Sequence, residues 1–351
     1  MTFHRRTLLK SAAAGAAAHA IPPARAAKPV RMSVGTQRYP TTPEMLDYFK
    51  RHAVGHIAGY SPEQGKPWTV DTLRRTRAMC EEHGVALDMV VPSGFRDREF
   101  LMPETRDRAI AAMQELIRDC AGAGIPAVKY NMSFLSMERT GNTPGRGGSS
   151  YSTWRWEDAK ARAGELTDAG RITEDVYWER VEHFLARVVP VANEYRIRMA
   201  CHPEDPGVPA SGYRGIVRPL GTPEGLKKFV ALHESPYHGL NLCLGTTAEM
   251  LQDPNREIHG IIRYFGERKK IFNIHFRNIK GKRDDFMEVW PDEGDMDMIE
   301  VARTLYEVDY PYMLMPDHMP RHPDDPGFGK QAFAYGFGYI KAVIQAIGRV
   351  G

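Results

Sequence analysis

The sequence predicts a (β/α)8 barrel (TIM barrel) built by one domain, residues 27–351. Short apolar runs rich in strand-forming residues alternate with longer segments of helical periodicity, the pattern of strand–helix units around a parallel sheet. We count eight such runs, and eight pairs in about 325 residues suit a closed barrel better than a doubly wound sheet. No GxGxxG motif follows the first run, and no GxxxxGK motif with a following Ser or Thr occurs anywhere.

The predicted elements alternate along the chain. The expected strands are Val30–Gly35, Val54–Tyr60, Ala86–Pro92, Ala127–Met132, Arg198–Pro203, Gly239–Gly245, Ile271–Phe276 and Tyr312–Asp317. The expected helices are Thr42–Ala53, Val70–His83, Glu104–Ala123, Glu174–Tyr195, Thr222–His233, Glu257–Glu267, Met296–Glu307 and Gln331–Ile347. Thr42-Pro43 and Thr222-Pro223 each combine a capping residue with a proline, which favours a helix start.

The composition is that of an ordinary globular enzyme. The chain has 351 residues, 42% hydrophobic and 26% charged, so it can bury a large core, and no Gly/Ser-rich or Pro-rich linker divides it. The formal net charge is +3, with basic and acidic residues intermixed. This pattern excludes a nucleic-acid partner and leaves a small acidic molecule as the target of local positive charge.

The first 26 residues resemble a twin-arginine signal peptide. Arg5-Arg6 precedes an apolar, alanine-rich stretch, and 18–20 or 24–26 offers a small-x-small cleavage site. The stretch is too short to span a bilayer. We therefore expect export to the periplasm through the twin-arginine machinery, without stable membrane insertion. The four cysteines form no CxxC pair or disulfide framework.

One segment interrupts the repeat. Residues Ser133 to about Arg171, rich in Gly, Ser, Trp and Arg, separate the fourth predicted strand from its helix. Long loops after barrel strands lie on the catalytic face. We expect a loop that covers the substrate, with contacts in a homo-oligomer as the alternative.

Metal-binding side chains occur at the ends of the last four predicted strands, where functional residues of barrels lie. They are His202, Cys243, His275 and Asp317. A lone strand histidine or cysteine is more often a core residue, but four consecutive strand ends predict one site. Two imidazoles, a thiolate and a carboxylate suit Mn, Fe, Co or Zn rather than Mg or Ca.

The same residues lie in a series of motifs that resembles the mannonate dehydratase family, relatives of the xylose-isomerase-like barrels. The resemblance extends from about Val30 to Gly348. The motifs are Tyr130-Asn131, Arg139-Thr140, 201–206 (CHPEDP), 239–243 (GLNLC), 275–278 (HFRN), 286–288 (FME), 293–298 (EGDMDM) and 316–318 (PDH). The chain departs from the family at Met319-Pro320, where the best-known members have Gly-His, and lacks their Asp-Trp before Arg139.

The resemblance implies a metal-dependent dehydratase that converts D-mannonate to 2-keto-3-deoxy-D-gluconate. It implies a divalent metal, typically manganese, on the four residues above. It also implies proton transfer by His318 beside Asp317 and a role for a tyrosine near the chain end, Tyr335 or Tyr339. For the sugar acid we expect binding by Arg277, Asn278, Lys280, Tyr130 and Asn131. Glu204, Asp205 and Glu288 are candidates to orient the ligands.

Two other functions stay open at this point. A sugar isomerase or epimerase of the xylose-isomerase-like class uses a similar barrel and metal, and differs in needing no cationic group for an acid. A periplasmic sugar-acid binding protein without chemistry would keep the pocket but would not need His318.

Overall fold

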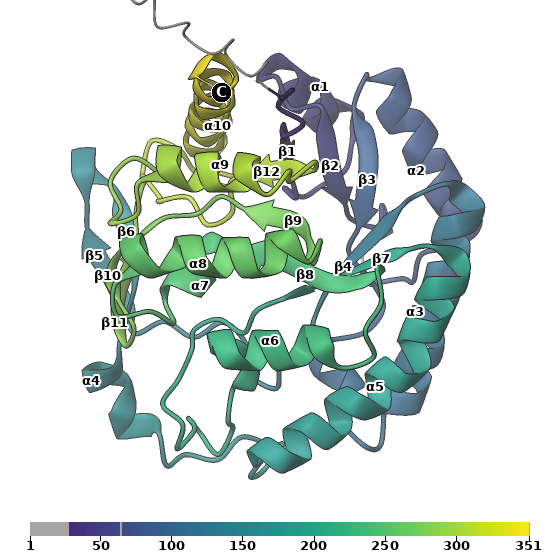
Figure 1. The fold of residues 1–351 in the computed structure, drawn as a ribbon, viewed down its shortest axis with the longest axis vertical. Coiled ribbons are helices and arrows are strands. Elements are labelled where there is room, and N and C mark those ends of the chain that lie inside the picture. The colour runs from purple at the N-terminus through teal and green to yellow at the C-terminus, as the bar shows by residue number, and fades with distance from the viewer. Residues whose placement is uncertain (1–27, 64, 351) are drawn as a thin grey trace, which may run out of the picture.

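A computed structural model describes residues 28–350 except residue 64, and it forms a closed parallel barrel (Figure 1). Around the barrel the strand order is β1-β12-β9-β8-β7-β4-β3-β2. The strands are β1 (Ser33–Thr36), β2 (His56–Gly59), β3 (Ala86–Val90), β4 (Ala127–Asn131), β7 (Arg198–His202), β8 (His238–Cys243), β9 (Ile271–His275) and β12 (Met313–Met315). The predicted TIM barrel and its eight strands are confirmed.

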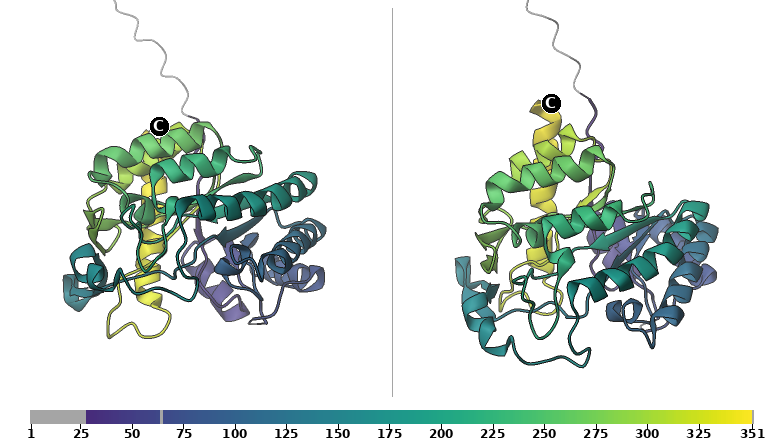
Figure 2. Two further views of the ribbon diagram at one scale, coloured as in Figure 1. Left: turned by 90° about the horizontal axis from the view of Figure 1, so that it is seen from below. Right: turned by 60° about the horizontal axis from the view of Figure 1, so that its bottom comes forward.

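Helices surround the barrel. The longer ones are α1 (Pro43–Arg51), α2 (Val70–Glu82), α3 (Arg106–Ala123), α5 (Glu174–Tyr195), α6 (Pro223–Ala231), α8 (Pro254–Glu267), α9 (Met298–Glu307) and α10 (Lys330–Val350), and the short ones are α4 (Trp156–Ala159) and α7 (Leu244–Ala248). Thr42 and Thr222 cap α1 and α6 as expected, each accepting a backbone N–H hydrogen bond just before a proline. Helices α2 and α3 (blue to teal) lie on one side of the molecule, and α8 and α9 (green) lie on the other (Figure 1, Figure 2).

A second, antiparallel sheet of order β10-β11-β6-β5 lies at one edge of the molecule (Figure 1). Its strands are β5 (Gly141–Pro144), β6 (Ser150–Arg155), β10 (Ile279–Lys282) and β11 (Asp285–Glu288). The long segment predicted after the fourth strand is present, and it contains two strands, β5 and β6, that were not predicted. These short, polar strands exist because β6 pairs with β11 from the loop after β9.

Alternation along the strands divides the core into two parts. Side chains that point inward fill the barrel and form one cluster, which contains Ala58, Met89, Ala127, Ala200, Phe272, Met313 and Met315. Outward side chains pack under the helices; Phe184 of α5, for example, contacts the rings of Phe100 and Tyr130 at centroid distances of 4.9 and 5.5 Å. Within the described residues, no helix combines the length and apolarity needed to cross a bilayer.

The last helix, α10, closes the barrel by contacting β1 and β12. Phe337 on this helix is fully buried and meets the rings of Phe49 and Tyr48 at 6.3 Å. The C-terminal helix α10 therefore packs against α1 at the seam of the barrel, the place where β1 pairs with β12.

We expect Phe337→Ala to lower the free energy of unfolding by about 3–5 kcal/mol, because it removes a fully buried ring and leaves a cavity. Chemical denaturation monitored by circular dichroism measures this change. Lys341→Ala, at an exposed position of the same helix, is the control and should change stability by less than about 0.5 kcal/mol. Equal effects of the two substitutions would contradict this account of the seam.

Candidate metal centre

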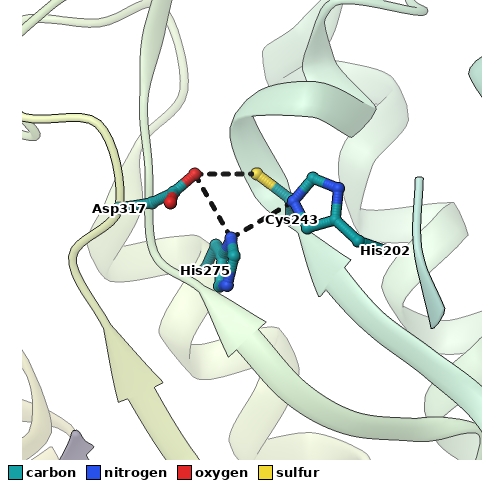
Figure 3. Close-up of side chains that lie close together, drawn as sticks. All are labelled: His202, Cys243, His275 and Asp317. Carbon is teal, nitrogen blue, oxygen red and sulfur yellow. Dashed lines mark hydrogen bonds and ion pairs between the residues drawn. The ribbon is translucent and has the colours of Figure 1, made fainter. Parts of the chain in front are cut away.

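Four side chains from separate strand ends converge at one end of the barrel (Figure 3). One ligand atom from each of His202, Cys243, His275 and Asp317 lies within 4.8 Å of the others. The His275 Nδ1 atom is 3.3 Å from His202 Nε2 and 3.2 Å from Asp317 Oδ2, and Cys243 Sγ is 3.7 Å from the same Asp317 oxygen. The structure thus brings the four predicted ligands together.

The barrel register explains this convergence. His202, Cys243 and His275 are the last residues of β7, β8 and β9, and Asp317 lies two residues beyond β12. Cys243 pairs with His275, and His275 pairs with Met315. Side chains at paired positions of parallel strands point to the same face, so Cys243 and His275 enter the barrel at the same level. His202 and Asp317 reach them from the strands on either side, β7 and β12.

The donors have the protonation behaviour that suits a cation. Desolvation lowers the pKa of His202 well below its ordinary value and also lowers the pKa of His275, so both rings are neutral at pH 7. Burial acts to raise the pKa of Asp317, but His275 and His318 outweigh it and hold that pKa well below its ordinary value. Burial raises the pKa of Cys243 to about 12, and metal binding deprotonates a coordinating thiol. Neutral imidazoles, a carboxylate and a thiol that can ionise fit a divalent cation.

Neighbouring groups orient two of the donors. Gln37 Nε2 donates a hydrogen bond of 3.1 Å to Asp317 Oδ1, and the Thr246 backbone N–H donates one of 3.4 Å to Cys243 Sγ. These contacts hold Asp317 Oδ2 and the sulfur toward the imidazoles. The sequence analysis missed Gln37, which lies just beyond the first strand.

His318 lies beside the centre, in a cavity of about 730 Å³ that Asp317 also lines. Its Nδ1 is 2.7 Å from Glu288 Oε1, and its Nε2 is 3.8 Å from Asp317 Oδ2. Desolvation acts to lower the pKa of His318, but the carboxylates of Asp317 and Glu288 raise it above its ordinary value. A third of the His318 side chain is exposed, so the ring can meet a ligand in this cavity.

A buried cluster of charges supports His318. Arg277 Nη2 lies 2.9 Å from Asp205 Oδ2 and 2.6 Å from Glu249 Oε1, and Arg277 Nη1 lies 3.0 Å from Glu288 Oε1. Arg139 adds ion pairs to Asp205, at 2.6 Å, and to Glu288. Burial acts to raise the pKa of Glu288, but His318 and the two arginines hold it at about 2, so this carboxylate stays charged.

Arg277 was predicted to bind the sugar acid, but in the structure it is buried among carboxylates. Its side chain is 1% exposed and is engaged by carboxylates. Gly245 makes room for it, since a Cβ at that position would overlap the arginine side chain. Arg277 therefore orients Asp205 and Glu288, two of the three residues predicted to support the ligands.

The other residues predicted to bind the sugar acid are spread more widely. Asn278 is buried, and its Nδ2 donates hydrogen bonds to the carbonyls of Pro291 and Met296. Tyr130 points outward into the core, and Lys280 is exposed on β10. Asn131 pairs with His202 in the barrel register, so of these residues it lies nearest the metal ligands.

Neither Tyr335 nor Tyr339 is among the described residues that line the cavity around His318. Tyr335 is 40% exposed and packs edge-on against Trp290 at 5.3 Å, and Tyr339 stacks on Tyr335 at 6.4 Å. The structure therefore does not bring either tyrosine together with the four metal donors.

The comparison with known proteins points to one family. A model of the D-mannonate dehydratase family matches residues 46–162 and 152–351. The mannonate dehydratase of Thermotoga neapolitana is 27% identical over 323 residues, which cover 82% of this chain and 88% of the relative. That of Streptococcus pneumoniae is 26% identical over 319 residues, covering 82% and 86%.

Solved structures agree with the sequence matches. The crystal structure of mannonate dehydratase from Streptococcus suis serotype 2 superposes with a TM-score of 0.79 at 26% identity, over 92% of this chain and 95% of that one. A D-tagatose 3-epimerase-like protein superposes with a TM-score of 0.60 at 14% identity, over 91% and 99%. The second likeness shows the fold alone.

The relatives correct one prediction. The match to the mannonate dehydratases contradicts the predicted export to the periplasm, and that prediction is wrong. That prediction came from residues 1–26, which were expected to be a signal peptide recognised by the export machinery. These residues lie outside the described part of the chain.

Substitution of a ligand should abolish stoichiometric metal binding. We expect Cys243→Ala and His202→Ala to lose bound metal, as measured by inductively coupled plasma mass spectrometry after dialysis, because each removes one of four donors. Cys201→Ala is the matched control, since Cys201 is equally buried but packs in the outer core. Retention of one equivalent of metal by Cys243→Ala would exclude the sulfur as a ligand.

The buried Glu204 should give the fold a pH dependence. Burial raises the pKa of Glu204 from 4.5 to about 7, so the folded protein holds this proton more tightly than the unfolded chain. Stability from this group is therefore lost as the pH rises from 4.5 through 7. Between pH 5 and pH 8 we expect Glu204→Gln to gain on the order of 2–3 kcal/mol relative to wild type in chemical denaturation. A pH-independent difference would contradict this assignment.

Proposed function

Because the chain belongs to the D-mannonate dehydratase family, we propose that it is a metal-dependent hydro-lyase that converts D-mannonate into 2-keto-3-deoxy-D-gluconate and water. One observation carries the proposal: four metal donors lie within 4.8 Å of one another beside His318. The cavity of about 730 Å³ has room for a six-carbon acid.

The metal in this proposal is manganese, bound by His202, Cys243, His275 and Asp317. The mixed nitrogen, sulfur and oxygen donor set supports a transition metal over magnesium or calcium. The chemistry that a bound divalent cation supplies is stabilisation of the negative charge that gathers on the substrate's carboxylate and C2 hydroxyl oxygens.

In the proposed reaction, His318 removes the proton from C2. In this proposal the proton of the neutral ring is on Nδ1 of His318, which lies 2.7 Å from Glu288 Oε1, and Nε2 is the basic nitrogen. Arg277 and Arg139 keep Glu288 charged and in place. A fixed tautomer and a fixed ring orientation are what a general base requires.

Elimination then needs a proton for the leaving hydroxyl. The electron pair of the C2–H bond forms the C2–C3 double bond, and the C3–OH bond breaks. In this proposal the proton taken up by His318 passes to the departing hydroxide, which leaves as water. The resulting enol becomes the 2-keto acid by taking a proton at C3 and releasing one from its C2 hydroxyl. Tyr335, whose ring packs on Trp290, is not needed for this sequence.

His318→Asn should abolish turnover while metal stays bound. Manganese-loaded wild-type protein is expected to form a 2-keto-3-deoxy acid from D-mannonate, detected by the thiobarbiturate assay, and the variant to lose at least 1,000-fold in kcat. Metal analysis of the variant is the control. Turnover at the wild-type rate would remove His318 from the mechanism, and absence of product from the loaded wild-type enzyme would reject the substrate.

A further inference from the structure

Lys129 is a lysine inside the barrel that the proposed reaction has not used. It lies on β4, where it pairs in register with Ala200 of β7, and Ala200 and Ala127 both pack in the inner cluster. The next inward residue on β4 is Asn131, which pairs with the ligand His202. The side chain of Lys129 therefore enters the barrel directly below the level of the metal donors.

The ammonium group of Lys129 has no partner of its own. The residue is 8% exposed, yet it forms no hydrogen bond and no ion pair with any residue in the described part of the chain. A charge on a largely buried side chain loses part of its solvation, and here no described residue compensates for that loss. The contrast is Lys270, which is 3% exposed and pairs with Glu234 Oε1 and the Ser235 carbonyl, both at 2.6 Å.

The charge of Lys129 acts on the centre itself. It lowers the pKa values of His202 and His275, although burial has the larger effect on both. It also acts on Asp97 and on Cys201, the other titratable groups that face it. Asp97 accepts a 2.9 Å hydrogen bond from Asn131 instead of forming an ion pair with the lysine.

Two of the arginines near the centre are already neutralised. Arg139 and Arg277 both bind carboxylates of Asp205 and Glu288. A divalent cation with the thiolate of Cys243, the carboxylate of Asp317 and two neutral imidazoles carries no net charge. Among the described residues, positive charge without a carboxylate partner remains on Lys129 and on Arg38 and Arg321, which line the cavity around His318. Lys129 is the one whose strand position lies directly below the metal donors, and its charge matches the single negative charge of a sugar acid.

We propose that Lys129 is a substrate-binding residue whose ammonium group binds the carboxylate end of the sugar acid at the metal centre, the role first expected of Arg277. The inference rests on the proposed function for the identity of the acid. It gives this side chain a part in the selection of acids over neutral sugars. The ammonium would also face the oxygens that become more negative as the C2 proton leaves, so it favours the transition state.

The test uses the manganese-loaded His318→Asn protein, so that binding is measured without turnover. Calorimetric titrations with D-mannonate and with glycolate compare this parent with the Lys129→Met double variant. Glycolate has the carboxylate and 2-hydroxyl common to all aldonic acids, so it probes the head group even if D-mannonate is not the substrate. We expect both acids to bind about 10- to 100-fold more weakly to the double variant, with metal content unchanged.

A second measurement separates binding from a structural role. Without ligand, Lys129→Met should melt at the same or a higher temperature than wild type, because it removes an unpaired buried charge. Lys270→Met, the matched control, should melt lower, because it leaves Glu234 and the Ser235 carbonyl without their partner.

Three results would overturn the assignment. They are equal affinity of parent and double variant for both acids, failure of the parent to bind either acid, and a lower melting temperature for Lys129→Met. Weaker glycolate binding in the double variant, together with no turnover of D-mannonate by the wild-type enzyme, would keep the role of Lys129 and reject only the proposed substrate.

Discussion

Closure of the eight-stranded parallel sheet into a barrel determines how close the four metal donors lie to one another. Because every second side chain of a strand points into the barrel, the last inward residues of neighbouring strands meet at one level. His202, Cys243 and His275 occupy those positions on three adjacent strands, and Asp317 follows the fourth. Residues separated by more than one hundred positions in the chain thus become a set of donors within 4.8 Å.

Burial of charge is the second constraint. Arg139 and Arg277 lie among the carboxylates of Asp205, Glu249 and Glu288, so nearly every charge next to the metal donors has a partner. Such clusters are costly to break because removal of one member leaves another buried and unpaired. Here the cluster keeps Glu288 ionised and aligned with His318. The charged Glu288 in turn orients His318 for the expected proton transfer.

The small antiparallel sheet explains how the insertion after β4 takes part in this cluster. Arg139 lies directly before β5, Glu288 ends β11, and β6 pairs with β11 between them. The insertion is therefore attached to the loop after β9, and it lines the cavity beside His318. Its short strands could not be predicted from local periodicity, because β6 pairs with β11 more than one hundred residues away and most of the side chains of β5 and β6 are polar.

The sequence by itself determined the repeat of strands and helices, and the four donors at strand ends, because hydrophobic periodicity and residue type are local properties. The resemblance added His318. Only the tertiary structure decided that Arg277 belongs to a buried network, that Tyr335 packs against Trp290 away from the cavity, and that Lys129 has no partner among residues 28–350 as described. Whether a charged side chain is neutralised or free depends on which distant residues the fold brings within about 4 Å of it, and no spacing along a single chain specifies that.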